Sequence, residues 1–349
     1  MKKHNKTTLI IGAIPYKNRE ESYGGTTVLL QNLIDYMASN QYPYKIIPTN
    51  RFNGKLLKKI NFLYVIWKYV INLNNIDIVT FHVTSKGAFI LFPILSPLAL
   101  LFNKKIVFRK FAGSFKSVYK KQSPITKAFF RFFLKKADLT FGETKELVSF
   151  FAEISGKPDK VLWFPNVRKK SKTIKISPYQ KRLVFISHVK QSKGINEILE
   201  VSKRLPPDYT LDIYGPIKDE SYTADYFKQY NVTYRGTINP DQVTNTLINY
   251  DILLLPTFHS GEGYPGIVIE AFSVGIPVIA TNFGGIPEIV TDRYNGRLIS
   301  PQNTDELEEA ILSFHSKNYS NYSQNALLSF HENFDSDTVN KRITNKIIS

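Results

Sequence analysis

Residues 260–280 read SGEGYPGIVIEAFSVGIPVIA and decide the fold of the segment around them. Residues 251–256 (DILLLP), just before this stretch, and residues 276–280 (IPVIA), at its end, are short apolar runs. Such runs, separated by a helical stretch, are typical of buried parallel strands joined by a covering helix. Pro265 suits the first turn of that helix, because the N–H that proline lacks would have no partner there. The sequence therefore predicts a strand–helix–strand unit of an α/β fold.

The alternation of short apolar runs and helical stretches continues on both sides of this unit, which favours parallel sheets covered by helices. In the first half we expect strands at 8–14, 44–48, 77–82, 105–109, 138–141 and 160–164, and helices at 26–39 and 55–73. In the second half we expect strands at 182–187, 209–214, 251–256 and 276–280, and helices at 195–204, 240–249 and 265–274. Two doubly wound units place a ligand crevice at the carboxyl ends of their strands, between the domains.

The chain length of 349 residues suits two domains of about 150 to 180 residues each. Residues 169–181 are polar, basic and non-periodic, so we expect a linker there. The prediction is a first domain at 1–168, a second domain at 182–330 and a C-terminal segment at 331–349.

The positive charge of the chain is concentrated in its first half. Residues 1–170 contain 29 Lys and Arg against 9 Asp and Glu, a net charge of +20, whereas residues 171–349 contain 17 against 20, a net charge of −3. A charge confined to one half indicates an anionic partner of that half. Nucleic acid is disfavoured as this partner, because no known nucleic-acid-binding motif is present.

Cysteine is absent, which excludes disulfides and thiolate metal sites and favours a reducing cytoplasm. Residues 1–17 have a basic start and a short apolar run, which indicates a first buried strand rather than a signal peptide. The longest apolar run, 88–102, is interrupted by Pro93 and Pro97 and is shorter than the roughly 20 residues that span a bilayer. We expect it to be a buried helix or a shallow element in contact with a membrane.

Three glycines open the loop before the central helix. Gly261, Gly263 and Gly266 allow a ligand to approach the backbone, and the free N–H groups at the helix start form an anion site suited to a diphosphate. Glu262 lies in the loop and Glu270 just over one turn inside the helix, where a carboxylate can accept hydrogen bonds from the hydroxyls of a ribose. The alternative is that both glutamates are solvated and the glycines only form a turn.

Glu262 and Glu270, with seven residues between them, resemble the signature of the family 4 glycosyltransferases of the GT-B fold. Other landmarks of that family occur in the expected order, densely over 182–300 and sparsely over 1–165. These landmarks are Gly24-Gly25, Pro165-Asn166, the basic loop 187–194 (SHVKQSKG), Gly215, Arg235-Gly236 and the turn 284–288 (GGIPE).

The resemblance implies an α/β GT-B architecture, in which two Rossmann-like doubly wound domains face each other across a cleft and a C-terminal helix at 331–349 crosses back to the first domain. It implies a retaining glycosyltransferase that moves a sugar from a nucleoside-diphosphate donor to a glycan or lipid-linked acceptor during synthesis of a capsule, exopolysaccharide or lipopolysaccharide. No cofactor and no metal is expected. The alternatives are a sugar-nucleotide epimerase or hydrolase on the same fold and a non-catalytic module that binds sugar nucleotides.

The resemblance also implies roles for single residues. Lys193 would neutralise the donor diphosphate and Glu262 would contact the donor sugar near the reacting carbon, so both are assigned as catalytic. Glu270 would bind the ribose, and Gly25 would close over the phosphates. The full set expected to bind the donor is Gly25, His188, Gly215, Gly263, Tyr264, Pro265, Gly266 and Glu270.

The family's phosphate-binding Arg falls at His188 in this chain. One fixed positive charge is therefore either missing or supplied by Lys190. A His is mostly neutral at pH 7 unless a phosphate raises its pKa. His188 is thus expected to be either a ligand of the diphosphate or a packed residue at a strand end.

The acceptor is expected to bind to the first domain. His82 ends a buried strand, so it is either a catalytic residue that faces the cleft or a hydrogen-bonded core histidine. Arg109 and Lys110 come at the end of another strand, a position that favours a binding loop, and we assign both to the acceptor. The family often has His-Gly where this chain has Ala112-Gly113, so no His is present for a role there.

Residues 115–136 interleave Lys and Arg with Phe, as in amphipathic helices that lie in an anionic membrane interface. The alternative is a helix that packs its Phe side chains on the sheet and exposes a basic face, and both descriptions can hold together. A polyprenyl-diphosphate-linked acceptor at the inner leaflet would account for the +20 charge. We therefore expect a cytoplasmic protein that is peripheral on the inner face of the cell membrane.

Overall fold

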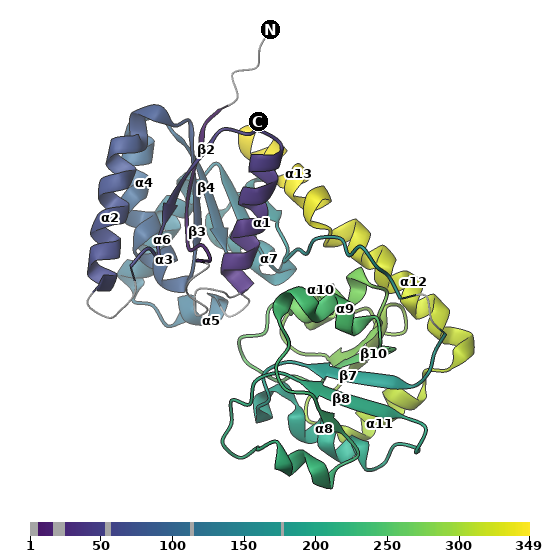
Figure 1. The fold of residues 1–349 in the computed structure, drawn as a ribbon. Helices are drawn as coiled ribbons and strands as arrows, with labels where there is room; N and C mark the ends of the chain where they lie inside the picture. Colours follow the sequence, from purple (N-terminus) through teal and green to yellow (C-terminus); the bar gives the residue numbers. More distant parts are fainter. Residues whose placement is uncertain (1–5, 17–24, 53–56, 112–114, 176–177) are drawn as a thin grey trace. The chain divides into compact units, whose positions relative to one another are not determined.

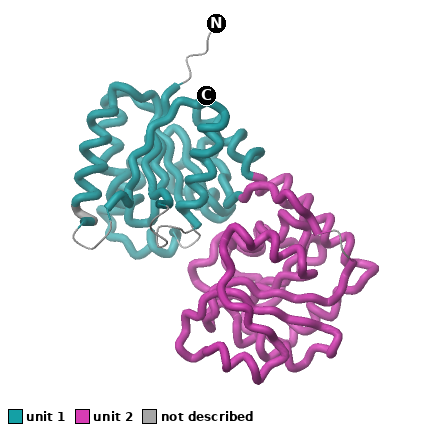
Figure 2. The backbone as a smooth tube through the Cα atoms, viewed as in Figure 1, with its two compact units in different colours: residues 1–167, 336–349 teal, residues 168–335 magenta. Residues whose placement is uncertain are grey.

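The computed structural model describes residues 6–16, 25–52, 57–111, 115–175 and 178–349, without the side chains of residues 58 and 59. The chain divides into two compact units (Figure 2): unit 1 comprises residues 1–167 and 336–349, and unit 2 comprises residues 168–335. Each unit contains a parallel sheet of six strands that is covered by helices. The predicted α/β fold is therefore confirmed for both units.

The sheet of unit 1 has the strand order β2-β1-β3-β4-β5-β6, and all its neighbouring pairs are parallel. β1 and β3 are buried along their whole length, as expected for strands covered on both faces. His82 of β3 lies in register with Arg109 of β4, so both residues come near the carboxyl edge of the sheet. The strands are β1 (Thr8–Gly12), β2 (Tyr44–Pro48), β3 (Ile78–Val83), β4 (Lys105–Lys110), β5 (Leu139–Gly142) and β6 (Val161–Trp163).

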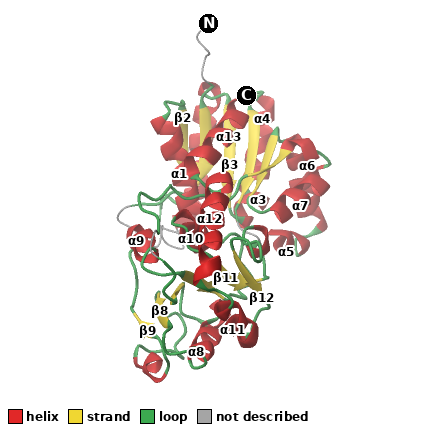
Figure 3. Ribbon diagram, turned by 90° about the vertical axis from the view of Figure 1, so that its right-hand side faces the viewer, coloured by secondary structure: helices red, strands yellow, loops and turns green. Residues whose placement is uncertain are grey.

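Helices cover both faces of this sheet (Figure 1). One face carries α2 (Leu57–Asn72), α3 (Ser85–Phe89), α4 (Leu91–Leu101), α5 (Phe115–Lys120), α6 (Pro124–Lys136) and α7 (Lys145–Ser155), whose buried side chains form one apolar cluster. The other face carries α1 (Gly25–Ser39) and α13 (Ser336–Ile348), which lie in front of the strands in Figure 3. α13 buries Val339, Ile343 and Ile347, at helical spacing, in the same cluster as Leu33 of α1. The last helix of the chain is thus part of the core of unit 1.

The sheet of unit 2 has the strand order β12-β11-β10-β7-β8-β9 and is also parallel throughout. Its strands are β7 (Arg182–Ile186), β8 (Thr210–Tyr214), β9 (Thr233–Tyr234), β10 (Ile252–Leu255), β11 (Val278–Thr281) and β12 (Gly296–Ile299). Its helices are α8 (Ile195–Ser202), α9 (Val243–Leu247), α10 (Gly266–Ser273), α11 (Thr304–Leu312) and α12 (Ser316–Asn333). α8 and α11 pack on one face of the sheet, and α9 and α10 lie on the other (Figure 1).

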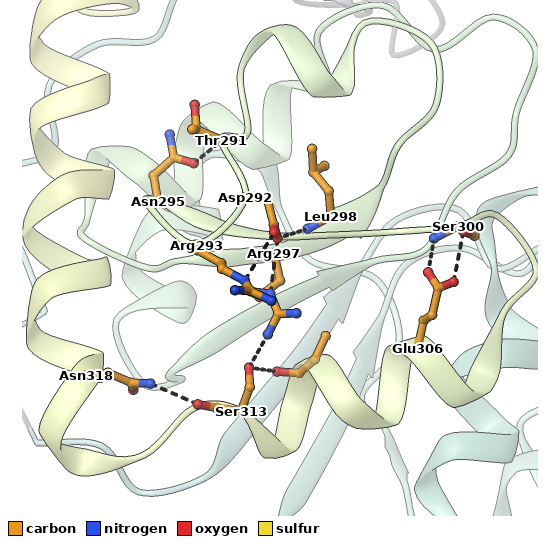
Figure 4. A network of polar contacts seen from close by, with 11 residues as sticks. Thr291, Asp292, Arg293, Asn295, Arg297, Leu298, Ser300, Glu306, Ser313 and Asn318 are labelled. Carbon is orange, nitrogen blue, oxygen red and sulfur yellow. Dashed lines mark hydrogen bonds and ion pairs between the residues drawn. The ribbon is translucent and has the colours of Figure 1, made fainter.

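A polar network fixes the edge strand β12 of unit 2 (Figure 4). Asp292 Oδ1 accepts hydrogen bonds from Leu298 N at 2.9 Å and Arg297 Nε at 3.1 Å. Arg297 also donates to Ser313 Oγ, at the end of α11, over 2.6 Å. The strand is therefore tied both to the turn before it and to the helix after it.

Strands β9 and β12 were not predicted, and two further stretches differ from the predicted arrangement. Residues 115–136 form two helices, α5 and α6, because Ser123 Oγ accepts a hydrogen bond from Thr126 N at 3.2 Å and Pro124 occupies the first turn of a new helix. Residues 168–181, mostly expected to form a linker, are counted with unit 2. Lys175 ties this stretch to unit 2, since its buried Nζ lies 2.7 Å from Asp251 Oδ1.

The apolar run 88–102 forms the end of α3 and all of α4. Phe92, Leu95 and Ala99 are buried against the sheet, as expected of a core helix. Among the residues that the structure describes, no helix combines the length and the apolar character needed to cross a bilayer.

Candidate functional site

The loop between β10 and α10 brings Glu262 and Lys193 together. Lys193 ends a short 3₁₀ helix, η4 (Gln191–Lys193), which follows β7, and its Nζ lies 2.5 Å from Glu262 Oε2. The same carboxylate oxygen accepts a hydrogen bond from Thr257 Oγ1 at 3.0 Å. Both side chains of the ion pair are about one-eighth exposed, 13% for Lys193 and 11% for Glu262, so water reaches them only in part. Two residues far apart in the sequence thus form one partly buried charged centre.

A close backbone contact holds Lys193 at this position. Gly194, the next residue, has a φ of +82°, and a Cβ at Gly194 would lie 2.2 Å from the carbonyl oxygen of Pro256. Only glycine combines that conformation with that approach. Phe258 N also donates to Ser192 O at 3.0 Å. The end of β7 is therefore fastened to the end of β10 through backbone atoms.

The turn 284–288 supports the Glu262 loop from the other side. Gly284 has a φ of +58°, and a Cβ there would lie 2.5 Å from the carbonyl oxygen of Glu262. Gly285 N donates to that oxygen over 3.3 Å. Tyr264 is buried, and its hydroxyl donates to Glu288 Oε2 at 2.6 Å. The Tyr264 side chain therefore anchors the loop, which leaves backbone groups of the loop to meet a ligand.

Glu270 is held by an arginine that the sequence did not single out. Arg168 Nε lies 2.5 Å from Glu270 Oε1, and the two side chains are 17% and 22% exposed. The guanidinium crosses directly over Gly266, since a Cβ there would lie 1.7 Å from Arg168 Nη2. The available signal is the position of Arg168 two residues after Pro165-Asn166, but the predicted domain boundary makes it the last residue of the first domain.

Positive groups gather around the loop that follows β7. Partial loss of hydration, followed by the charges of Lys218, Lys190 and Lys193, lowers the pKa of His188. Partial burial and the same lysines, Lys190 and Lys193, lower the pKa of His259, although the Glu262 carboxylate opposes this shift. Like charges held this close favour the neutral form of both imidazoles. The loop is therefore suited to an anion, which would relieve the repulsion.

Gly215 follows β8 and lies against the loop that follows β7. It has a φ of +136°, and a Cβ there would lie 1.8 Å from the carbonyl oxygen of Ser187. Gly215 N donates to Gly236 O at 2.8 Å. The ends of β7 and β8 can approach this closely only with glycine at position 215. The structure thus brings Lys193, His188, Gly215, Glu262 and Glu270 onto loops and helix starts of one unit.

His82, Arg109 and Lys110, predicted for the acceptor side of unit 1, are all buried. His82 is 3% exposed, and neither ring nitrogen has a hydrogen-bond partner within the described residues. Burial, followed by the charge of Arg109, lowers the pKa of His82 well below its usual value. Lys110 donates to the carbonyl oxygen of Phe111, and burial lowers its pKa to about 8.

Arg109 is 1% exposed, and its three guanidinium nitrogens have no hydrogen-bond partner in the described part of the chain. Its guanidinium carbon lies 3.3 Å from the ring centre of Phe164 and 4.5 Å from that of Phe111. Burial lowers the pKa of Arg109 to about 9, an effect that the Glu143 carboxylate opposes. Arg109 is thus held by aromatic faces rather than by a counter-ion pair at hydrogen-bond distance.

The structure gives fewer contacts for the other positions of unit 1 that the sequence singled out. Gly25 begins α1, is exposed, and has nothing within 4 Å of where a Cβ would stand. Its role toward phosphates stays a prediction. Gly24, Ala112 and Gly113 lie outside the described residues.

Comparison with known proteins decides the family of unit 2. Residues 166–327 match the family model of the glycosyl transferases group 1. The matched residues make up most of unit 2, so unit 2 is similar to that family. The resemblance found in the sequence is confirmed, because the match covers the same segment as the dense motifs.

Two curated relatives each align with less than half of this chain. TuaC of Bacillus subtilis, whose name places it in teichuronic acid biosynthesis, is 30% identical over 138 residues, which are 39% of this chain and 34% of TuaC. The amylovoran biosynthesis glycosyltransferase AmsK of Erwinia amylovora is 28% identical over 142 residues, which are 38% and 35% of the two chains. The chain thus spans about a third of the length of these two relatives.

Solved structures match both units of this chain. HepE from Anabaena, in a complex with UDP, has a TM-score of 0.72 and 16% identity over 97% of this chain and 99% of its own. Sucrose-phosphate synthase from Thermosynechococcus elongatus has a TM-score of 0.72 and 13% identity over 98% of each chain. At such low identity the likeness concerns the fold alone, and it confirms the two-domain α/β architecture of the GT-B type.

Proposed function

We propose that this chain is a retaining glycosyltransferase that moves a sugar from a nucleoside-diphosphate donor to a glycan or lipid-linked acceptor in the synthesis of a cell-surface polysaccharide. The observation that carries the proposal is the Lys193–Glu262 pair, held beside the start of α10. TuaC and AmsK, both named for polysaccharide biosynthesis, support the pathway class. HepE, which has been crystallised with UDP and with UDP-glucose, supports a uridine nucleotide as the first donor to test.

The charges of unit 2 suit the bond that must break. When the bond between the anomeric carbon and the diphosphate breaks, its electron pair stays on the diphosphate and the sugar becomes cationic. Lys193 and Lys190 are fixed cations for the leaving group, and the N–H groups at the start of α10 add positive dipoles. The Glu262 carboxylate then stabilises the cationic sugar. In this proposal these groups act in place of a metal ion, and no cofactor takes part.

Donor binding would rearrange the pair. The Nζ of Lys193 exchanges the carboxylate of Glu262 for a phosphate oxygen, a charge-assisted contact of similar strength. Glu262, kept in place by Thr257 Oγ1, is then available to the sugar. The diphosphate also raises the pKa of His188, which partial burial and then the neighbouring lysines lower in the free protein. His188 and Lys190 together supply the charge of the absent arginine.

Arg168 acts in this proposal as a positioning residue for the ribose contact. A carboxylate has two oxygens that can each accept hydrogen bonds. Arg168 Nε holds Oε1 of Glu270, which leaves Oε2 for the ribose hydroxyls. Arg168 therefore fixes the orientation of Glu270 before the nucleotide binds.

We assign the acceptor to unit 1, at the carboxyl edge of its sheet. His82, Arg109 and Lys110 lie there, and the buried guanidinium of Arg109 has N–H groups without partners in the described residues. An anionic acceptor, such as a polyprenyl diphosphate carrying a sugar, would satisfy them. The proposed location is the cytoplasm, at the inner face of the membrane where such lipids are presented.

A nucleotide-release assay tests the proposed function. The protein is incubated with UDP-glucose, with and without a polyprenyl-diphosphate-linked sugar, and the free nucleotide is measured. We expect release that depends on the acceptor, is lost in Glu262→Gln and yields a product with the donor's anomeric configuration by NMR. Release without acceptor would indicate a hydrolase or epimerase instead, and donor binding without turnover on any acceptor would indicate a binding module.

A further inference from the structure

Large apolar side chains are exposed unevenly between the two units. Of the eighteen that are exposed among the described residues, fourteen lie in unit 1, all on α2, on α4 with its flanking residues, or on α6. The four in unit 2 are scattered over separate elements, as is normal for single surface residues. The most exposed members in unit 1 are Leu63 (65%), Trp67 (56%), Leu101 (74%) and Ile125 (82%).

Each of the three helices has a second apolar side that the core does not use. On α2, Val65 and Tyr69 face the sheet, whereas Leu63 and Trp67 are exposed, one turn apart. On α6, Phe130, Phe133 and Leu134 are buried, whereas Ile125, Phe129 and Phe132 recur at helical spacing on the outer side. A helix that is apolar on its outer side as well is expected to meet an apolar environment there.

The three outer sides belong to one surface. α2, α4 and α6 contribute to the same apolar cluster and so cover the same face of the sheet (Figure 1). They follow β2, β3 and β4 in turn, and such right-handed crossovers place successive helices next to one another on that face. We call these outer sides of α2, α4 and α6 the outer helix surface.

The outer helix surface is also strongly basic. α6 carries four basic side chains at the surface, Lys127, Arg131, Lys135 and Lys136, and none of α2, α4 and α6 contains an acidic residue. On α6, Arg131 and Lys135 are exposed beside Phe132. On α2, the Nζ of Lys68 lies 4.5 Å from the ring centre of Trp67. Basic side chains around Trp, Phe and Leu are typical of elements that lie in an anionic membrane interface.

We propose that the outer helix surface docks unit 1 on an anionic lipid bilayer. Leu63, Trp67 and Leu101 enter the boundary between headgroups and acyl chains, and the lysines meet the lipid phosphates. A second copy of the chain is a poorer occupant, because a symmetric contact would bring two uncompensated basic surfaces together. The inference deepens the proposed function by naming the surface that would present unit 1 to a lipid-linked acceptor.

One end of the docked surface also faces the edge of the sheet that carries the proposed acceptor residues of unit 1. α2 runs back across the sheet after β2, and the short helices α3 and α5 lie between the ends of β3 and β4 and the starts of α4 and α6. That edge carries His82 and Arg109. A lipid headgroup near the first turns of these helices would therefore need only a short path to those residues.

Sedimentation with vesicles tests the docking surface through a matched pair of variants. Leu63→Asp/Leu101→Asp changes two residues of the outer helix surface, and Leu312→Asp/Leu328→Asp changes two residues of unit 2 that are 45% and 46% exposed. We expect the first variant to bind vesicles of phosphatidylglycerol and phosphatidylcholine at least about tenfold more weakly than the parent, since two apolar insertions are lost. The control variant should bind as the parent does.

Equal binding by the parent and the first variant would overturn the proposal. The proposal would also be overturned if the parent did not bind vesicles but formed a dimer, and if Leu63→Asp/Leu101→Asp dissociated that dimer. The surface would then contact a second copy of the chain. Thermal stabilisation by UDP, measured on the same samples, reports whether the donor site of unit 2 binds nucleotide. A failure of the docking surface can therefore be told apart from a failure of the donor site.

Tryptophan fluorescence provides a second, local test. The chain has two tryptophans, Trp67 on the outer helix surface and Trp163 in β6. In Trp163→Phe, the remaining Trp67 should shift to shorter wavelengths on vesicles and be quenched by brominated acyl chains. In Trp67→Phe, the remaining Trp163 should show neither effect. An unquenched Trp67 on vesicles that bind the protein would contradict insertion of α2.

Discussion

Unit 1 and unit 2 share a parallel sheet of six strands but hold their buried charges differently. In unit 2, Lys175 lies against Asp251 and Lys193 against Glu262. In unit 1, His82 and Arg109 are buried without a hydrogen-bond partner in the described part of the chain. Ion pairs organise the loops of unit 2 before any ligand binds, whereas the buried groups of unit 1 cost free energy that an anionic partner would offset.

The largest effect should come from breaking the buried pair of unit 2. We expect Asp251→Ala to destabilise the protein by about 3–5 kcal/mol, because Lys175 remains as an uncompensated buried cation. Two backbone N–H groups, of Gln180 and Arg182, also lose their acceptor. Urea unfolding measures the loss, and hydrogen exchange should assign it to β7 and β10.

Asp208→Ala is the matched control, because Asp208 pairs with Lys181 at the exposed surface of the same unit. We expect no measurable change from it. Equal effects of the two substitutions would show that the Lys175–Asp251 pair does not hold 168–181 to unit 2.

The next prediction concerns Arg168 of unit 2, whose ion pair with Glu270 lies in the proposed nucleotide site. We expect Arg168→Met to weaken UDP binding about tenfold, since Glu270 loses the contact that orients it. Gly266→Ala should act in the same direction, because its methyl group displaces the guanidinium. Isothermal titration checks both, and Arg168→Lys should recover part of the affinity. UDP affinity unchanged in all three would leave Arg168 with a purely structural role.

The stability of unit 1 should depend on pH through Lys110. Burial lowers the pKa of Lys110 from 10.5 to about 8, so the unfolded chain binds more protons than the folded chain between those values. Stability contributed by Lys110 therefore rises as pH increases from about 8 toward 10.5. We expect a higher Tm at pH 9.5 than at pH 8 after subtraction of the Lys110→Met profile. Identical profiles would mean that Lys110 is charged and solvated in the folded state.

Arg109 should give the smallest effect on stability. We expect Arg109→Met to change the free energy of unfolding by less than about 1 kcal/mol, because the lost cation–π contacts are offset by removal of a buried charge. The same substitution should abolish turnover with a diphosphate-linked acceptor. A large destabilisation would show instead that Arg109 is a structural part of the core.

The sequence predicted most of the strands well, because they depend on local patterns. β2 has the predicted bounds, and β10 differs by one residue at each end, since short apolar runs define both strands. The sequence assigned both Lys193 and Glu262 to the donor site, and the structure places them at hydrogen-bond distance; their roles stay predictions. Neither the split of 115–136 at Ser123 nor the membership of 168–181 in unit 2 was predicted.

The features that could not be predicted from the sequence depend on contacts between residues that are distant along the chain. Arg168 reaches Glu270 across 102 positions of the chain, and nothing local to either residue indicates the pair. The burial of Arg109 depends on Phe164 from a different strand end. The outer helix surface needs three helices in the same layer, although the residues 115–136 alone already indicated a basic and aromatic segment.

Titration of UDP into the parent, Lys193→Met and Lys317→Met tests the donor site most directly. Lys317 is an exposed lysine of unit 2 at the start of α12, so its substitution removes the same charge outside the loops of the site. We expect Lys193→Met to weaken UDP binding by about 10- to 100-fold, because the phosphate loses a charge-assisted contact and meets an unpaired Glu262. Lys317→Met should bind as the parent does. Parent-like affinity in Lys193→Met would contradict a diphosphate site built on Lys193 and Glu262.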